Sequence, residues 1–419
     1  MNKAKSDDLR PEYRREDLGP GVRGKYFKHF RFAKILDSWP EARLRELMGR
    51  VGPGEVSRAL GREELHPEDL AALLSPMALP RLEDLARRAN RLTRRHFGRT
   101  VGLYAPLYLS NVCTSECTYC FFARGAGGRG RRRTLSPAEI RAECESLARH
   151  GFQTILLVSG DAPRVAPPGY LAQAVATARE YFPSVSVEVY ALDEEGYRTL
   201  AAQGLEGVTL YMETYHRETY ARVHLAGKKR DYDYRLGALE RAGRAGVRRL
   251  NVGALLGLYD WRLDGFWTAL HARYLQKECW QSAVSVSFPR LRQAPPRHPV
   301  RHPVSDRDLV QLMVALRLFL PEVGFNLSTR EPAALRDRLI PLGVTNMSAG
   351  SSTRPGGYSH PGEELQAQFE VEDRRPPAEV AAAIRRAGYD PVWKDFDQAF
   401  FEGVGRPPAD ISSQEGKGP

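Results

Sequence analysis

The stretch that decides the fold runs from Gly102 to Ser110 (GLYAPLYLS) and continues directly into residues 111–120 (NVCTSECTYC). The first part is an apolar run of strand length, and the second places three cysteines in the spacing C-x3-C-x2-C. Thiolates are the ligands that iron–sulfur clusters need, and a tight loop can turn three sulfurs inward. The stretch therefore predicts a strand that leads into a loop holding an iron–sulfur cluster.

Three cysteines leave one iron of a four-iron cube without a protein ligand. That iron can bind the amino and carboxylate groups of S-adenosylmethionine, and electron transfer into the sulfonium then releases a 5′-deoxyadenosyl radical. The motif also resembles the signature of the radical S-adenosylmethionine superfamily. We therefore expect Cys113, Cys117 and Cys120 to hold a 4Fe–4S cluster, with S-adenosylmethionine as the second cofactor.

A zinc site in a basic, nucleic-acid-binding protein is the remote alternative. Structural zinc takes four ligands, usually as two spaced pairs, whereas Cys144 and Cys279 stand alone with no Cys/His pair near either. The net charge is +11, but much of it is arginine scattered along helix faces, without interleaved aromatic residues on which bases could stack. We expect a solvated basic surface and no nucleic-acid partner.

The composition also indicates the cellular compartment. No stretch approaches the roughly 20 apolar residues of a membrane span, and no apolar signal-peptide core follows the charged N-terminus. Five cysteines, three of them clustered, do not form a disulfide framework, and an iron–sulfur cluster of this type needs a reducing compartment. We expect a cytoplasmic protein with no membrane partner.

Strand and helix patterns alternate after Gly98, and eight short apolar runs read as parallel strands. About eight βα units predict an α/β fold, a TIM-type (β/α)8 barrel with an N-terminal helical extension and a C-terminal extension. The predicted strands are 102–110, 154–159, 185–190, 208–212, 250–255, 284–288, 325–328 and 345–348. The predicted parts are an arm with helices (1–98), the barrel (99–358), an extension (359–402) and a disordered tail (403–419).

Most predicted strands end on polar residues, and barrel chemistry sits at the carboxyl ends of the strands. Together these ends predict one lined cavity that also receives the cysteines. The residues at those ends include Asp161, Glu213, Arg290, Arg330 and Ser348. A Gly- and Arg-rich stretch at 124–133 follows the cysteines directly and predicts a flexible basic loop, which could cover the cluster or dock an electron donor.

Several rare strings, in one order, give a more specific resemblance. They are Tyr108 to Cys120, Tyr211 to His216, Gly227 to Lys229, Ser285 to Arg292, Leu327 to Glu331, Pro355 to Tyr358 and Asp373 to Pro376. From about Pro67 to Asp397, the sequence resembles the aromatic-amino-acid lyases of the radical S-adenosylmethionine superfamily. Within them it is most similar to the tyrosine lyases of thiamine thiazole biosynthesis.

The resemblance implies a reaction and its partners. S-adenosylmethionine would be cleaved reductively to methionine and 5′-deoxyadenosine, and the Cα–Cβ bond of L-tyrosine would break to give p-cresol and 2-iminoacetate (dehydroglycine). The imine would pass to thiazole synthase, which implies a physical partner. A flavodoxin- or ferredoxin-type protein would supply electrons.

The resemblance also assigns roles near the cofactors. Tyr119 would lie near the adenine, and Gly160-Asp161 takes the place of the family's Gly-Glu, which contacts the methionine amino group. Glu213 and Arg235 would contact S-adenosylmethionine, and the planar guanidinium of the arginine would bind its carboxylate. The structural alternative for Arg235 is a salt bridge on a helix surface.

For the substrate, Arg330 would clamp the carboxylate of tyrosine, and Tyr108 and Ser348 would orient the amino acid. Arg330 could instead pair with Glu331 or Asp337. His216 and Arg290 are weaker candidates that could brace the site.

Related lyases are the competing interpretations. The hydrogenase-maturation tyrosine lyases need further C-terminal cysteines, and no cysteine follows Cys279 here. A deazaflavin-cofactor synthase or a tryptophan lyase would share the barrel, but the strings at 373–376 and 393–395 favour the thiamine branch. Three features depart from the family pattern: Phe121 in place of glycine, Asp161 in place of glutamate, and the long loop at 124–133.

Overall fold

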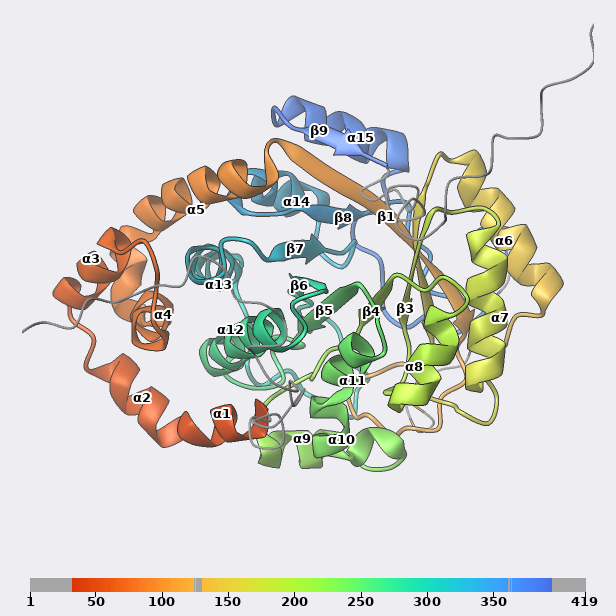
Figure 1. Cartoon of the computed structure of the whole chain (residues 1–419), viewed down its shortest axis with the longest axis horizontal. Helices are drawn as coiled ribbons and strands as arrows, with labels where there is room; N and C mark the ends of the chain where they lie inside the picture. The colour runs from red at the N-terminus through yellow and green to blue at the C-terminus, as the bar shows by residue number, and fades with distance from the viewer. Residues whose placement is uncertain (1–31, 124, 126–129, 361, 363, 394–419) are drawn as a thin grey trace, which may run out of the picture.

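A computed structural model describes residues 32–123, 125, 130–360, 362 and 364–393. Eight parallel strands form a closed barrel, because β1 pairs with β8 on one side and with β2 on the other. The strands are β1 (Thr100–Ser110), β2 (Thr154–Ser159), β3 (Ser184–Glu188), β4 (Gly207–Thr209), β5 (Arg249–Gly253), β6 (Ala283–Ser287), β7 (Gly324–Leu327) and β8 (Asn346–Ser348). The predicted barrel is confirmed, with all eight predicted strands in place (Figure 1).

The barrel interior is unusually polar. TIM-type barrels usually fill this space with layers of Val, Ile and Leu. Here Asn251 donates to the hydroxyl of Ser287 at 2.8 Å, and Asn346 donates to the side-chain oxygen of Asn326 at 3.0 Å. Polar inward-facing side chains leave the carboxyl end of the barrel open to a polar cavity rather than sealed by an apolar layer.

Helices surround the barrel in the order that the βα repeat predicts (Figure 1). They are α6 (Pro137–Arg149), α7 (Pro168–Arg179), α8 (Glu194–Ala201), α9 (Arg217–Val223), α10 (Tyr232–Leu236), α11 (Ala238–Arg244), α12 (Trp261–Glu278), α13 (Asp306–Phe319) and α14 (Ala333–Leu339). A capping box begins α6, since Ser136 and Glu139 each accept from the other's backbone N–H. Short 3-10 turns η4 (Lys228–Arg230) and η5 (Ile340–Leu342) complete this part.

An N-terminal helical layer covers one side of the barrel, at the red and orange end of the chain in Figure 1. It consists of α1 (Phe32–Ser38), α2 (Glu41–Gly49), α3 (Pro53–Gly61), α4 (Pro67–Leu74), η3 (Pro76–Arg81) and α5 (Leu82–Phe97). Helices α4 and α5 pack on α13, and α1 packs on α12. An apolar stripe along α4 and α5 explains this packing, since Leu70, Leu73, Leu85 and Ala89 are fully buried.

The C-terminal extension contains a ninth strand that was not predicted from the sequence. Helix α15 (Pro377–Arg386) lies in this extension, and β9 (Asp390–Val392) follows it and pairs in parallel with Thr100–Gly102 of β1. Three residues that include Pro391 give little strand signal, and proline is tolerated there because β9 is an edge strand. Residues 1–31 of the predicted N-terminal part (1–98), residues 124 and 126–129 of the predicted basic loop and the predicted tail at 403–419 lie outside the described residues.

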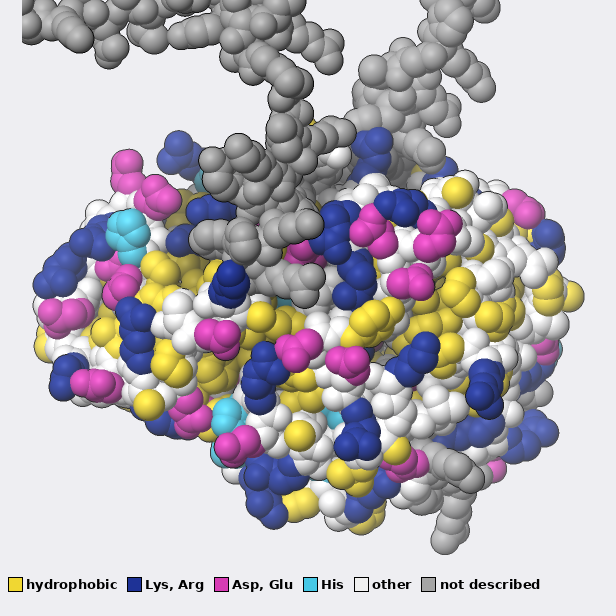
Figure 2. Space-filling view, turned by 60° about the horizontal axis from the view of Figure 1, so that its bottom comes forward, with side chains coloured by type: hydrophobic (Ala, Val, Ile, Leu, Met, Phe, Trp, Pro, Cys, Tyr) yellow, Lys and Arg dark blue, Asp and Glu magenta, His cyan; other side chains and the backbone are white. Residues whose placement is uncertain are grey.

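Charges of both signs are interspersed over the face shown in Figure 2. Many arginines pair with nearby acids, as Arg87 does with Glu83 and Arg141 with Glu180. Within the described part of the chain, no helix is long and apolar enough to cross a membrane.

Candidate active site

The three motif cysteines line one cavity of about 80 Å³ at the carboxyl ends of the barrel strands. The loop that carries them begins where the register between β1 and β2 shifts, between Tyr108 and Ser110. Backbone hydrogen bonds fix the loop, with the N–H of Thr118 donating to the carbonyl of Val223 at 2.9 Å. Strand β1 thus delivers the three thiols to one place, as the sequence predicts.

The environment of the motif cysteines favours the protonated thiols until a metal binds. Burial raises the pKa of Cys113 to about 11 and that of Cys117 to about 12, so these thiols are neutral until a metal displaces their protons. The backbone N–H of Phe122 donates to the sulfur of Cys120 at 3.4 Å. Among the described residues, no three Cys, His, Asp or Glu side chains converge on one ion-sized point.

Gly160 and Asp161 close the cavity beside the cysteine loop. A Cβ atom on Gly160 would lie 2.2 Å from the carbonyl oxygen of Val112, so only glycine permits this approach. Oδ2 of Asp161 accepts from the hydroxyl of Ser115 at 2.7 Å, while its buried Oδ1 has no partner. A buried, unpaired carboxylate oxygen needs a donor, and the ammonium group of a bound amino acid would supply one.

Glu213 occupies a strained turn at the end of the fourth strand. Its φ is +69°, which makes it the one non-glycine residue with positive φ in the described chain. Oε1 of Glu213 lies 2.6 Å from Nζ of Lys229 and 3.4 Å from the guanidinium of Arg235. Burial would lower the pKa of Lys229, but the neighbouring Glu213 raises it above its usual value, so the amine stays charged.

Asp264 holds the residues that follow Glu213. Its Oδ1 accepts from the backbone N–H of Tyr215 at 2.8 Å and from the hydroxyl of Thr214 at 3.0 Å. Strained backbone persists only where surrounding contacts over-determine it, and Asp264 supplies such contacts.

Arg235 is buried, and its ion pair with Glu213 lies inside the molecule rather than on a helix surface. Its Nε donates to the carbonyl of Tyr211 at 2.8 Å, and the side chain lines the cysteine cavity.

Tyr119 is not among the residues that line the cysteine cavity, and a histidine engages its hydroxyl. The hydroxyl lies 2.8 Å from Nε2 of His224, whose Nδ1 lies 2.8 Å from the carbonyl of Tyr220. Burial lowers the pKa of His224, so the ring is neutral; Nδ1 donates to the carbonyl and Nε2 accepts from Tyr119. Tyr119 therefore braces the cysteine loop through its hydroxyl.

Arg330 has no acidic partner among the described residues. Glu331 instead pairs with Arg290, and Asp337 pairs with Arg375, so neither of the two expected structural partners is available. The Arg330 guanidinium lies 3.7 Å from the ring centroid of Phe369, and its buried Nε makes no hydrogen bond.

The hydrogen bonds of Tyr108 and Ser348 stabilise the structure near Arg330. The hydroxyl of Tyr108 donates to Oε1 of Gln368 at 2.5 Å, and the Tyr108 ring meets Phe122 edge-on. The hydroxyl of Ser348 accepts from the backbone N–H of Thr329 at 3.0 Å, which fixes the turn before Arg330.

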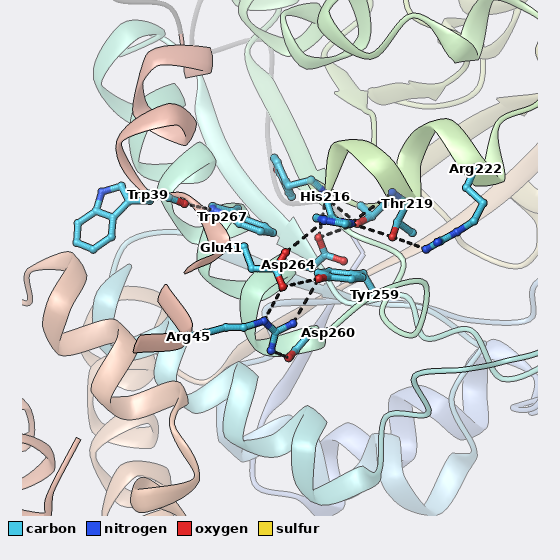
Figure 3. A network of polar contacts seen from close by, with 12 residues as sticks. Trp39, Glu41, Arg45, His216, Thr219, Arg222, Tyr259, Asp260, Asp264 and Trp267 are labelled. Carbon is cyan, nitrogen blue, oxygen red and sulfur yellow. Dashed lines mark hydrogen bonds and ion pairs between the residues drawn. The ribbon is translucent and has the colours of Figure 1, made fainter. Parts of the chain in front are cut away.

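The two weaker candidates, His216 and Arg290, both brace the surrounding structure. Figure 3 shows His216 at the centre of a polar network that reaches the N-terminal layer. Its Nε2 lies 3.3 Å from Oε2 of Glu41, and its ring stacks on Tyr259 with centroids 4.0 Å apart. Arg290 is buried against Glu331.

The cavity lining also includes three polar residues that were not predicted as site residues from the sequence: Glu188, Lys229 and Gln368. Glu188 ends β3, so the same rule of polar strand ends could have identified it. Lys229 lies in a recognised string but carries no motif of its own. Gln368 comes from the C-terminal extension, and only the tertiary fold places it beside β1.

A larger cavity of about 390 Å³ opens at the opposite, amino-terminal ends of the strands. Its lining includes Arg248, Glu206 and Glu322 but none of the cysteines. Since barrel chemistry sits at the carboxyl ends, the smaller cysteine cavity is the candidate active site.

Comparisons with known families agree with this location. The radical SAM superfamily model matches residues 107–271, which contain the cysteine loop and the Glu213 turn. The Biotin and Thiamin Synthesis associated domain model matches residues 287–390, which contain Arg330 and Gln368.

Among solved structures, the FeFe-hydrogenase maturase HydG from Carboxydothermus hydrogenoformans is similar with a TM-score of 0.79 at 30% identity. The match covers 87% of this chain and 85% of that one. Methylornithine synthase (PylB) has a TM-score of 0.64 at 22% identity, a likeness of fold alone.

Two relatives match over nearly their whole lengths. The 2-iminoacetate synthase of Escherichia coli (strain K12) is 46% identical over 360 residues, which is 86% of this chain and 94% of that protein. The 2-iminoacetate synthase of Salmonella typhimurium is 44% identical over the same shares. The chain therefore belongs to the 2-iminoacetate synthase family of the radical SAM superfamily.

Proposed function

We propose that this chain cleaves the Cα–Cβ bond of L-tyrosine to p-cresol and 2-iminoacetate, the imine used for the thiazole ring of thiamine. As a member of its family the chain is a radical carbon–carbon lyase. One observation carries the assignment of the site: Arg330, a guanidinium with no acidic partner among the described residues, lies within electrostatic reach of Cys120 and Glu188 in the cysteine cavity. Such a guanidinium is suited to an amino-acid carboxylate.

Cys113, Cys117 and Cys120 would hold a 4Fe–4S cluster, and Asp161, Glu213, Lys229 and Arg235 would hold S-adenosylmethionine. Together these cofactors supply the 5′-deoxyadenosyl radical when bound. Gly160 lets β2 approach the cysteine loop closely.

Arg330 would bind the tyrosine carboxylate, with Phe369 limiting the directions that the guanidinium can take. Tyr108, tied to Gln368, and Ser348, tied to the Thr329 turn, would keep that arginine in place. The aromatic side chains of Phe122, Tyr190 and Tyr211 line the cavity and would limit the access of water to the reacting substrate, which protects a radical from side reactions.

The partners belong to the same proposal. We expect a flavodoxin- or ferredoxin-type donor to supply electrons and thiazole synthase to take up the imine in a cytoplasmic setting. Transfer to a partner suits an imine, because it hydrolyses to glyoxylate and ammonium in free solution.

The test is anaerobic reconstitution with iron and sulfide, followed by S-adenosylmethionine, dithionite and L-tyrosine. p-Cresol, 5′-deoxyadenosine and glyoxylate should appear together, and all three should vanish in Cys117→Ala. Cys144→Ala is the control, since Cys144 is buried in α6 and does not line the cavity. 5′-Deoxyadenosine without p-cresol would mean that the substrate is not tyrosine.

A further inference from the structure

Two of the three acidic side chains that line the cysteine cavity have protein partners. Glu213 pairs with Lys229 and Arg235, and Asp161 accepts from Ser115. Glu188 is the third, and among the described residues no hydrogen bond or ion pair engages its carboxylate.

Glu188 is the last residue of β3 and lies opposite Val158 of β2. Several charged groups lie within electrostatic reach of Glu188: Glu213 after β4, Lys229 in η4 and Arg235 in α10, which line the same cavity, and Arg330 after β7. Tyr104, Tyr108 and Tyr211 also lie within its electrostatic reach. The carboxylate is thus surrounded by protein but opens onto the cavity rather than onto a side-chain partner.

Arg330 is the unpaired cation that matches this unpaired anion. Its guanidinium and the Glu188 carboxylate influence each other electrostatically but do not form an ion pair. Glu188 and Arg330 are both half-buried. Leaving a carboxylate and a guanidinium unpaired in such surroundings is unfavourable, unless a ligand with both charges lies between them. An amino acid in its zwitterionic form has both charges on neighbouring atoms.

We propose that Glu188 binds the α-ammonium group of the tyrosine substrate while Arg330 binds its carboxylate. This inference rests on the proposed function, since it assigns a role within the same tyrosine site. It gives the enzyme a second point of recognition on the amino acid, which selects against phenols that carry a carboxylate but no amine. The ammonium of S-adenosylmethionine has its own acceptor in the unpaired Oδ1 of Asp161, beside the cysteine loop.

The experiment measures binding without turnover. Reconstituted enzyme with S-adenosylmethionine and no reductant is titrated calorimetrically with L-tyrosine and with 3-(4-hydroxyphenyl)propanoate, which lacks the amine. Glu188→Gln keeps the size of the side chain and removes its charge. Ser186→Ala is the matched control: Ser186 lies two residues earlier on the same strand, faces the same side and lines the neighbouring cavity.

Glu188→Gln should weaken tyrosine binding by about tenfold or more, which is ~1.4 kcal/mol, and change binding of the deamino analogue less than twofold. Ser186→Ala should change neither. Equal weakening of both ligands, or weakened S-adenosylmethionine with unchanged tyrosine, would overturn the role of Glu188. The p-cresol assay on the unsubstituted enzyme separates that failure from a failure of the proposed function, because it does not depend on Glu188→Gln.

Discussion

Nζ of Lys229 lies 2.6 Å from Oε1 of Glu213, the residue whose backbone is held in the left-handed region at the end of the fourth strand. Both side chains are largely buried in the cavity that the motif cysteines line. The ion pair thus couples a strained backbone turn to the short 3-10 turn η4. We infer that it sets the position of Glu213 for S-adenosylmethionine.

Lys229→Gln should weaken S-adenosylmethionine binding by about tenfold, because Glu213 then keeps only its longer, 3.4 Å pair with Arg235 and is held less firmly in place. Equilibrium dialysis with the reconstituted protein gives the affinity. The neighbouring and exposed Lys228 supplies the control, Lys228→Gln, which should bind normally. Equal loss in both variants would point to net charge rather than to the Glu213 pair.

Arg330→Lys should lower kcat/KM for tyrosine by roughly a hundredfold, since lysine keeps the charge but loses the fork that matches a carboxylate. The affinity of Arg330→Lys for S-adenosylmethionine should stay within about twofold of the native value, because the residues proposed to bind S-adenosylmethionine are not the ones proposed to bind tyrosine. Steady-state p-cresol formation measures the first quantity and dialysis the second. Arg338→Lys, on the exposed side of α14, is the control and should be neutral. A normal kcat/KM in Arg330→Lys would remove Arg330 from the tyrosine site.

Gly160→Ala should impair cluster assembly, because its Cβ would lie 2.2 Å from the carbonyl of Val112 and 3.2 Å from Cβ of Cys113. Relieving that contact moves the cysteine loop, at a cost of about 1–3 kcal/mol for a forced fit. Iron per chain after reconstitution should fall. Gly169→Ala in α7 meets nothing within 4 Å and should assemble normally. Full iron content in Gly160→Ala would show that the loop accommodates the methyl group.

His271 makes the stability of the N-terminal layer sensitive to acid. It is buried and stacks on Phe32 of α1 with ring centroids 4.2 Å apart, and burial lowers its pKa from 6.5 to about 3. Between those pH values the unfolded chain binds a proton that the folded chain does not, so stability falls as pH drops below about 6.5.

Comparing Tm between pH 7 and pH 4.5 in the native protein and in His271→Gln isolates this contribution. The variant should be less stable than the native protein at pH 7, because the substitution removes the stacked ring. Its Tm should fall less than that of the native protein when the pH is lowered to 4.5. Parallel Tm curves for the two proteins would exclude His271 as the titrating group.

The barrel could be predicted from the sequence because its signals are local. Each strand is a short apolar run, and helices such as α6 begin at recognisable caps. Strand β4 proved shorter than predicted: Leu210 and Met212 still donate to β5, but the chain turns sharply at Glu213. The polar barrel interior and β9 had no clear pattern, because both depend on pairing with distant strands.

The site residues could be predicted from the sequence where a motif alone identifies them, as it does for the three cysteines. They could not be predicted where the role depends on pairing. That Arg330 is unpaired follows from Glu331 and Asp337 being taken by Arg290 and Arg375, which only the tertiary structure decides. Lys229 and Gln368 likewise gain their roles from neighbours far away in sequence.

The most direct test of the central claim is to follow which bond of tyrosine breaks. The reconstituted enzyme is given L-tyrosine labelled with carbon-13 at Cβ, or separately at Cα, and the products are analysed by mass spectrometry. Cleavage of the Cα–Cβ bond predicts the Cβ label only in the methyl group of p-cresol and the Cα label only in glyoxylate. Both labels in one product, or unlabelled p-cresol from Cβ-labelled tyrosine, would contradict the tyrosine-lyase assignment.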